Sequence, residues 1–207
     1  VEPGSWLCFR NVIEISDNPQ DVCLSIAADS KYWLWVNGEI QVREGGLKRG
    51  PNPNDTYCDV IRSLPALRRG KNTIAVLVWY FGKDGFSHRN SPTPGMTFAL
   101  QVNGRPIVPR RDWRVKKHPA FYLPQGPNPN YRLPESNVGF DAAKDIPFTE
   151  ASFNDRSWDK ARKVSLDCAG WNRLVERPIP LWRDFGLKSY MHTEMKNDTT
   201  LVAYLPY

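Results

Sequence analysis

Aromatic and polar side chains that could bind a sugar gather around two long loops. The apolar run 73–80 ends in Trp79 and Tyr80, where it enters a loop over 82–95. A second loop, over 126–141, is also rich in aromatic residues and acids. A ring face packs against the C–H side of a pyranose, while fixed polar groups bind its hydroxyls. The candidate stacking rings are Trp79, Tyr80 and Tyr131, and the candidate hydroxyl partners are Asp84, His88, Asn90, Glu135 and Asp141.

These residues also have a structural interpretation, which the sequence leaves open. Trp79 and Tyr80 would then close the end of the hydrophobic core, and the acids would fix turns or cap short elements. Glu135 and Asp141 are in addition candidate oxygen ligands for Ca²⁺, because this ion takes carboxylates and backbone carbonyls from irregular loops. No other cofactor is expected.

The motifs of several enzyme classes are missing from the sequence. His88, His118 and His192 lack the spacing of a metal-binding H-E-x-x-H motif, and there is no G-x-S-x-G, P-loop or G-x-G-x-x-G pattern. A glycosidase needs only two carboxylates, one on each side of the glycosidic bond. Acids are plentiful in this sequence, but their positions do not show which two would lie close together. We therefore predict no catalytic residue and no metal–histidine site.

The charge pattern gives little support to a nucleic-acid partner. The chain has 28 Lys and Arg against 22 Asp and Glu, a net charge of +6. Its densest basic cluster, 110–117, is either a phosphate contact or a solvated strand and turn, and we favour the latter. Apolar runs such as 74–78 are far shorter than the ~20 residues of a membrane span.

The four cysteines, Cys8, Cys23, Cys58 and Cys168, have no C-x-x-C spacing. Cys8 and Cys23 fall on successive expected strands, which is compatible with a disulfide and equally with separate buried thiols. The cysteines therefore do not decide the compartment.

Short strands must position the two loops. The pattern predicts strands at 6–15, 22–27, 32–36, 39–42, 58–61, 73–80, 96–102, 106–108 and 111–116. Asn-Gly pairs at 37–38 and 103–104 are typical of type I′ hairpin turns, and the continuous apolar run 73–80 is typical of a strand buried on both faces.

The predicted fold class is all-β. Turn-punctuated strands without a long helical stripe favour an antiparallel β-sandwich of the jelly-roll type, with long loops and one short helix near 155–161. We expect this domain to span 1–186, and 187–207 to begin a following domain or a linker strand. Since the chain starts at Val1 without Met or a signal peptide, we expect a fragment of a larger protein.

Two sets of segments resemble domains of glycoside hydrolases. The first set resembles galactose-binding-like jelly-roll domains, including those of β-galactosidase-type and β-glucuronidase-type enzymes. It consists of A-D-S-K-Y-W-L-W-V-N-G-E (28–39), D-V (59–60) and L-R-R-G-K-N-T-I-A-V-L-V (67–78). The second set resembles the N-terminal domain of bacterial α-L-rhamnosidases. It consists of G-F-D-A-A (139–143), F-N-D-R-S-W-D-K-A (153–161) and E-R-P-I-P (176–180). The sequence departs from that family's pattern at Ala143, Asn154 and Leu181, where the family has Arg, Asp and Pro.

The resemblance implies a non-catalytic accessory domain, sugar-binding or scaffolding, of an α-L-rhamnosidase that acts on plant-type polysaccharides or glycosides. Its implied partners are a rhamnose- or galactose-containing glycan and a catalytic (α/α)6 barrel of the same polypeptide, and its implied location is periplasmic or extracellular. The alternative is a structural domain, without a ligand, of another glycoside hydrolase.

Overall fold

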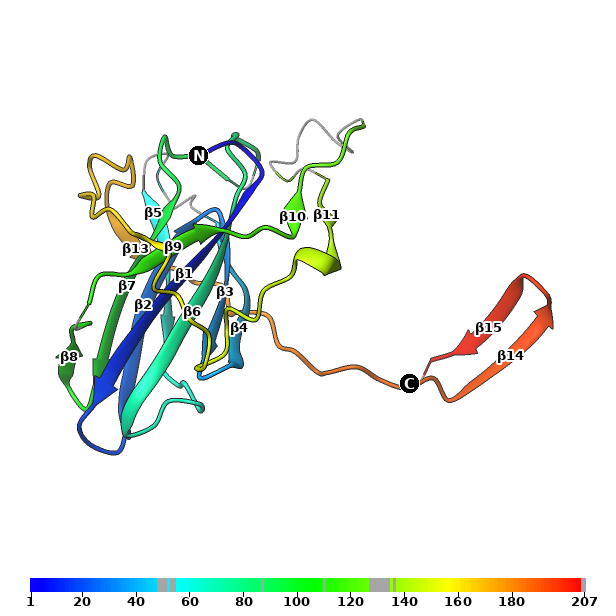
Figure 1. Cartoon of the computed structure of the whole chain (residues 1–207), viewed down its shortest axis with the longest axis horizontal. Helices are drawn as coiled ribbons and strands as arrows, with labels where there is room; N and C mark the ends of the chain where they lie inside the picture. Colours follow the sequence, from blue (N-terminus) through cyan, green and yellow to red (C-terminus); the bar gives the residue numbers. More distant parts are fainter. Residues whose placement is uncertain are drawn as a thin grey trace.

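The computed structural model describes residues 1–47, 52, 55–86, 88–109, 111–126, 135 and 137–205. Two sheets pack face to face into a sandwich (Figure 1). In order across the first sheet, the strands are β12 (Asp159–Lys160), β9 (Arg114–Lys117), β1 (Ser5–Ile15), β6 (Gly70–Tyr80), β3 (Lys31–Val36) and β4 (Glu39–Gly46). In the second sheet the order is β13 (Leu174–Glu176), β5 (Thr56–Ile61), β2 (Val22–Asp29), β7 (Gly95–Val102) and β8 (Arg105–Ile107).

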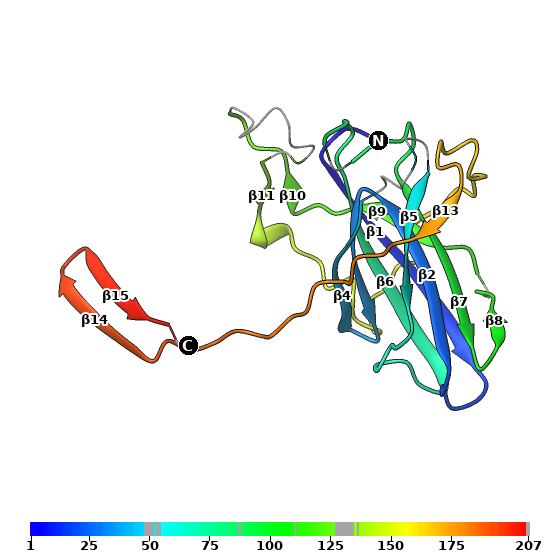
Figure 2. The same cartoon turned by 180° about the vertical axis from the view of Figure 1, so that it is seen from behind.

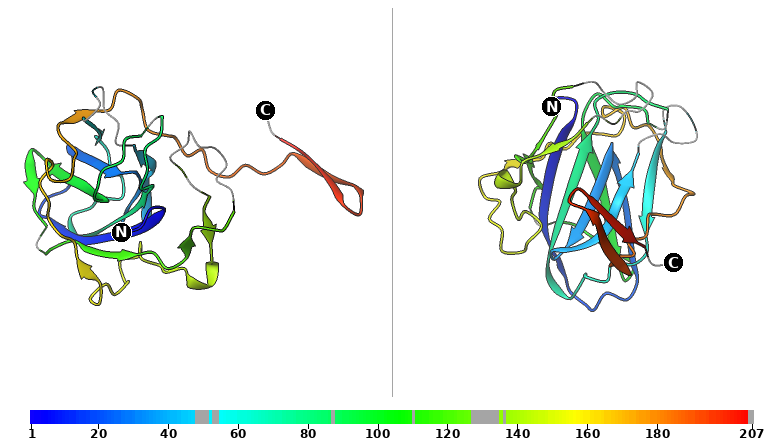
Figure 3. Two further views of the ribbon diagram at one scale, coloured as in Figure 1. Left: turned by 90° about the horizontal axis from the view of Figure 1, so that it is seen from above. Right: turned by 90° about the vertical axis from the view of Figure 1, so that its right-hand side faces the viewer.

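Smaller elements lie outside the two sheets. They are the pair β10 (Phe121–Tyr122) and β11 (Gly139–Phe140), the 3-10 turn η1 (Ala142–Lys144), and the hairpin of β14 (His192–Asn197) and β15 (Thr200–Tyr204). The hairpin lies apart from the sandwich at the end of an extended segment (Figures 1 and 3). The boundary at 186 stays a prediction. In the part of the chain that is described, no helix has the length and apolar character needed to cross a membrane.

The all-β sandwich is confirmed, with one difference in strand direction. β13 pairs with β5 in parallel, whereas the other ladders among the described residues are antiparallel. β13 arrives at the free edge of β5 after a long connection rather than a hairpin, so nothing forces it to run antiparallel.

Both Asn-Gly pairs form the expected tight turns. Asn37 and Gly38 have φ of 54° and 86°, and Asn103 and Gly104 have φ of 51° and 72°. Two consecutive positive φ angles are the condition for a type I′ hairpin, which Asn and Gly meet at the lowest steric cost.

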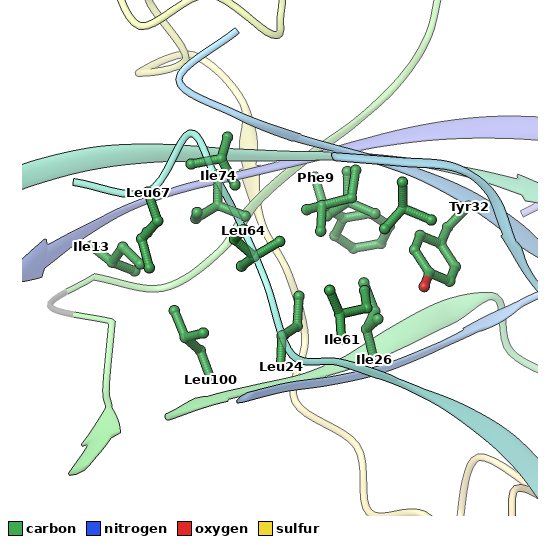
Figure 4. Close-up of a cluster of buried hydrophobic side chains, with 14 of the residues drawn as sticks. Phe9, Ile13, Leu24, Ile26, Tyr32, Ile61, Leu64, Leu67, Ile74 and Leu100 are labelled. Atoms are coloured by element: carbon green, nitrogen blue, oxygen red, sulfur yellow. The ribbon is translucent and has the colours of Figure 1, made fainter. Parts of the chain in front are cut away.

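Strand alternation builds the main core between the sheets. In β3, Tyr32, Leu34 and Val36 are fully buried, while Trp33 and Trp35 point to the other face. Figure 4 shows Tyr32 among Phe9, Leu24, Ile26 and other aliphatic side chains from both sheets. Burial of these side chains from water drives the sheets together.

A second apolar cluster covers the outer face of the first sheet. Trp6, Leu77, Phe148 and Trp158 form its buried part, and Trp33, Trp35 and Trp79 lie at its border. Described residues between 118 and 126 and between 137 and 158 supply the side chains that cover this face (Figures 1 and 3). β6 is therefore buried on both sides over most of its length, as its continuous apolar sequence predicts.

A buried ion pair fastens this covering segment to the sheet. Arg10, 2 % exposed, donates from Nε to Asp155 Oδ2 at 3.2 Å and from its terminal nitrogens to the carbonyls of Phe148, Glu150 and Phe153. Arg111 adds bonds of 2.9 and 2.7 Å to the two oxygens of Asp155.

The helix predicted near 155–161 is wrong. Residues 156–157 form a turn and Asp159–Lys160 is strand β12, which pairs with β9. The carboxylate of Asp155 is held by two arginines and Trp158 is buried in the outer cluster, so tertiary contacts override the local pattern.

The four cysteines are free thiols. Cys8 and Cys23 lie on strands of different sheets, β1 and β2, rather than on paired neighbours, and Cys8 is buried in the outer cluster. Burial, together with the nearby charge of Asp145, raises the pKa of Cys8 far above its ordinary value. The separate-thiol alternative is therefore the one that the structure supports.

Replacing Asp155 by Ala should cost about 3–5 kcal/mol of folding free energy, because it leaves the buried guanidinium of Arg10 without its counter-ion. The loss would be measured by urea unfolding at pH 7. Asp198→Asn on the exposed hairpin is the matched control and should change stability by less than about 0.5 kcal/mol.

Asp155 should also make stability depend on pH in the acid range. Burial by itself raises the pKa of Asp155, but the hydrogen bonds and charges of Arg111 and Arg10 outweigh it and lower the pKa below 3.8. Its contribution is then complete above the unfolded-state pKa and lost as pH falls through the folded-state pKa. Between pH 6 and pH 2.5, the free energy of unfolding should fall less steeply with decreasing pH in Asp155→Asn than in the unmodified chain. Equally steep falls in the two proteins would contradict this assignment.

Candidate functional site

The polar side chains of the 82–95 loop are held by a buried cluster around Asp29. The Asp29 carboxylate accepts hydrogen bonds from Ser30 Oγ at 2.8 Å and from the Ser91 amide at 2.7 Å. His88 Nε2 lies 3.1 Å from Asp29 Oδ1 and 3.2 Å from Ser30 Oγ. All of these residues are buried, so the structure favours the structural interpretation of His88.

The combination of Asp29, Ser30 and His88 is not a catalytic triad. In a triad the nucleophile and the acid bind opposite nitrogens of the imidazole ring, which allows the ring to pass a proton. Here both groups lie against the same nitrogen, Nε2, and none of the three side chains reaches solvent.

Hydrogen bonds within the protein also occupy the side chains of Tyr80, Asn90 and Asp84. The Tyr80 hydroxyl donates to the Ser91 carbonyl at 3.1 Å, and Asn90 Nδ2 donates to the same carbonyl at 2.8 Å. Asp84 Oδ1 accepts from the Asn90 amide at 2.7 Å. Tyr80 is 5 % exposed, so its ring cannot stack on a ligand.

Asp141 caps η1 rather than facing the other predicted residues. Its Oδ1 accepts from the Ala143 amide at 3.1 Å, and Lys144 Nζ lies 2.9 Å from Oδ2. The hydrogen bond from Lys144, followed by the one from the Ala143 amide, lowers the pKa of Asp141. The predicted stacking residue Tyr131 lies outside the described residues.

Trp79 and Glu135 are predicted residues from the two different loop regions, and both lie beside one side chain, Lys31. In the β3–β6 ladder Lys31 is the register partner of Trp79. Lys31 Nζ lies 3.2 Å from Glu135 Oε1, 2.6 Å from Glu44 Oε1 and 6.0 Å from the centre of the Phe81 ring. We call these five residues the Lys31 cluster.

An aromatic row borders the Lys31 cluster on the outer face of the sheet. Trp79 stacks on Trp6 with ring centres 4.7 Å apart, and its edge contacts Phe81 at 4.8 Å. Trp6 in turn stacks on Phe121 at 4.0 Å. Trp79 is partly exposed, so it contributes both to this packing and to the surface beside Lys31.

Neither Lys31 nor Glu44 was predicted from the sequence. The signal was present for Lys31, because it precedes Trp33 by two residues and must share its face of the strand. No local pattern marks Glu44 or places it against Lys31, since it comes from the next strand, β4.

The residues do not fit the predicted Ca²⁺ site. Glu135 and Asp141 each have a lysine partner, Lys31 and Lys144, and a cation in that position opposes a metal ion. Within the described part of the chain, no group of three His, Cys, Asp or Glu side chains could hold a metal ion.

A groove of about 700 Å³ begins at the Lys31 cluster and follows the edge of the first sheet. It lies between β4 and the segment that leaves the sandwich after β13, which Figure 2 shows in orange as it runs from β13 across the strands toward the C-terminus. Lys31 and Glu44 line it from the first sheet, and Arg177, Trp182, Arg183 and Phe185 line it from that segment.

Arg177, which lines this groove, is held by the buried carboxylate of Asp59. Arg177 Nε donates to Asp59 Oδ1 at 2.6 Å, and its Nη2 donates to the Gly46 carbonyl. Asp59 Oδ2 accepts from the Tyr32 hydroxyl at 2.9 Å and from the Gly46 amide at 3.0 Å. Burial, reinforced by the adjacent carboxylate of Asp59, raises the pKa of Tyr32.

Comparison with known proteins shows what the fold resembles. No protein-family model and no curated protein sequence matches the chain significantly. Among solved structures, the GH78 rhamnosidase of Bacillus sp. GL1 superposes with a TM-score of 0.69 and 28 % identity, over 86 % of this chain and 19 % of that protein. The chain folds like one domain of a GH78 α-L-rhamnosidase.

More distant structures share the fold alone. The α-L-rhamnosidase of Aspergillus terreus has a TM-score of 0.61 at 17 % identity, over 96 % of this chain and 23 % of that protein. The Pleurotus ostreatus lectin has a TM-score of 0.51 at 17 % identity, over 84 % of this chain and 42 % of the lectin. The chain thus spans about a fifth of the length of the rhamnosidases.

The segments that resemble rhamnosidases have structural roles in this rhamnosidase-like domain. Asp155 of the second segment holds Arg10, and Arg177 of the third holds Asp59. Asp141 of the first segment caps η1. Asp155 and Arg177 fix the return of the chain across the sandwich and Asp141 fixes a local turn, so the resemblance marks the fold rather than a ligand site.

Removing the charge of Arg177 should destabilise the domain. Arg177→Met leaves the carboxylate of Asp59, 3 % exposed, without its counter-ion and should cost about 3–5 kcal/mol. Arg62→Met is the matched control, because its pair with Glu176 is exposed and contributes less than about 1 kcal/mol. Guanidinium unfolding would measure both; equal losses would mean that Asp59 does not need Arg177.

Proposed function

We propose that this chain is a non-catalytic accessory domain of an α-L-rhamnosidase-type glycoside hydrolase that acts on plant-type polysaccharides or glycosides. The observation that carries the proposal is the similarity to the Bacillus GH78 enzyme over 86 % of this chain and only 19 % of the enzyme. Catalysis would belong to an (α/α)6 barrel of the same polypeptide. Such enzymes degrade polysaccharides in the periplasm or outside the cell, and we propose that location here.

The carboxylates of the Lys31 cluster support a non-catalytic role. A glycosidase needs one protonated carboxylic acid in apolar surroundings and one ionised carboxylate. Glu44 and Glu135 both bind the ammonium group of Lys31, so they share one environment and neither has apolar surroundings. These surroundings therefore do not assign the acid role to one carboxyl group and the base role to the other.

The same cluster suits a sugar. The partly exposed ring of Trp79 offers a stacking surface, and the ammonium and carboxylate groups beside it can donate to and accept from hydroxyls. The Pleurotus protein of similar fold is a lectin, which is compatible with carbohydrate binding by this architecture. We propose that the domain contacts a rhamnose- or galactose-containing glycan through the Lys31 cluster.

A scaffolding role is the second candidate, and a specific observation favours it. His88, Tyr80, Asn90 and Asp141, which were predicted to bind sugar hydroxyls or rings, form hydrogen bonds within the protein. In this case the domain would pack against the rest of a larger enzyme and bind no ligand.

Titration with L-rhamnose and with galactose, followed by tryptophan fluorescence, separates the two candidates. Sugar binding should give a saturable change in the millimolar range, because a single exposed ring and a few hydrogen bonds give weak affinity. Lys31→Met should weaken this binding roughly threefold or more, since a charged hydrogen-bond partner is lost.

Lys163→Met, on an exposed loop, is the matched control and should bind as the unmodified chain does. If neither sugar changes the tryptophan fluorescence, carbohydrate binding is contradicted and the scaffolding role remains. Equal affinities for Lys31→Met and the control would place the sugar elsewhere.

A further inference from the structure

The segment 181–186 is fixed against the first sheet at two points. The side chain of Leu181 packs against the main core. Three residues further on, Asp184 Oδ2 lies 2.6 Å from Arg43 Nη2 of β4, and Asp184 Oδ1 accepts from the Gly186 amide at 2.9 Å. Together with Arg177 at the start, these anchors give the segment a defined course beside the groove. The backbone of the segment is therefore positioned before any ligand arrives.

The side chains next to these anchors point into solvent. Trp182 is 75 % exposed and Phe185 76 % exposed, and both line the groove. Exposed rings that gather along one groove, rather than lying scattered singly, form the kind of apolar surface that marks an interaction site. Arg183, also exposed, lies between them in the sequence and lines the same groove.

The charges that line the groove are balanced with one exception. Arg177 is paired with Asp59, Lys31 with Glu44 and Glu135, and Arg43 at the rim with Asp184. Within the described part of the chain, Arg183 has no carboxylate within salt-bridge distance. The groove thus offers one guanidinium to a ligand with one negative charge.

We propose that this groove binds an acidic sugar, a uronic acid unit of a glycan chain. The uronate carboxylate pairs with the guanidinium of Arg183, whose two parallel N–H groups match a carboxylate. The C–H face of the pyranose packs on the ring of Trp182 or Phe185. A volume of about 700 Å³ lies within the range of small-molecule sites, roughly 300–1,000 Å³.

This inference rests on the proposed carbohydrate-binding function and extends it. The Lys31 cluster forms one end of the same groove, since Lys31 and Glu44 line it. A glycan could then place a neutral unit at the Lys31 cluster and an acidic unit at Arg183. The specificity for an acidic unit comes from residues 182–185, and those residues belong to none of the segments that resemble rhamnosidases.

Nuclear magnetic resonance of the whole chain tests the proposal through the indole N–H signal of Trp182. This signal is identified as the one that disappears in Trp182→Phe. Glucuronic acid and galacturonic acid should shift it, with affinities roughly fivefold or more above those of glucose and galactose at low salt. Added salt should reduce that difference, because it screens an exposed ion pair.

Arg183→Gln should abolish the preference for the uronic acids and leave the weak affinity for neutral sugars. Trp182→Ala removes the reporter signal, so its binding is measured by isothermal titration calorimetry beside the unmodified chain; both affinities should fall roughly tenfold, as loss of an aromatic anchor predicts. Arg162→Gln and Tyr190→Ala, at exposed positions that do not line the groove, are the matched controls. Circular dichroism would verify that every variant keeps the fold.

Three results would overturn the inference. If acidic and neutral sugars shift the Trp182 signal equally, the proposed function stands and the specificity is wrong. If uronic acids bind but Arg183→Gln and Trp182→Ala bind them unchanged, the acidic site lies elsewhere. If no sugar shifts the signal and Trp182→Ala instead abolishes self-association of the chain, the rings form a protein interface.

Discussion

The apolar character of both faces of the first sheet determines most of the remaining architecture. One face of β1, β3 and β6 packs against the second sheet, as in any sandwich. The other face carries Trp6, Leu77 and a border of three further tryptophans, which water would solvate poorly. Side chains from 118–126 and 137–158 therefore cover this face, although these ranges contain little regular structure. The irregular segments complete the core that the strands leave open.

An irregular covering segment needs anchors that regular hydrogen-bond ladders do not supply. Arg10 satisfies three backbone carbonyls of this segment and binds the carboxylate of Asp155. Arg177 does the same for the next return of the chain, across Asp59 and the carbonyl of Gly46. Buried pairs of this kind add little net stability compared with apolar residues, but breaking one is costly. Several backbone paths over this face would bury a similar apolar area, and the buried ion pairs select one of them.

These anchors also decide which polar groups remain for a ligand. His88 and Asn90 of the 82–95 loop, with Tyr80 at the end of β6, bind the loop to the Asp29 cluster. The groove at the edge of the first sheet is lined by charged groups, Lys31 and Glu44 at one end and Arg183 among the others. The similarity to a GH78 rhamnosidase concerns a domain of a much longer protein, and such a domain is suited to present an edge groove while the bulk of its polar residues maintain the fold.

The sequence by itself determined strands β1 to β9, though not β10 to β13, together with the two Asn-Gly turns and the alternation that separates Tyr32 from Trp33. Each of these depends on residues within a few positions of one another, because strand periodicity and turn geometry are local properties. The tertiary structure alone decided that His88 meets Asp29, that Glu135 meets Lys31 and that Arg177 meets Asp59. These pairs join residues 59, 104 and 118 positions apart. Their formation depends on where long loops return to the sheets, and the return is governed by burial of the outer face and by desolvated charges that must find partners. No local pattern in the sequence encodes that geometry.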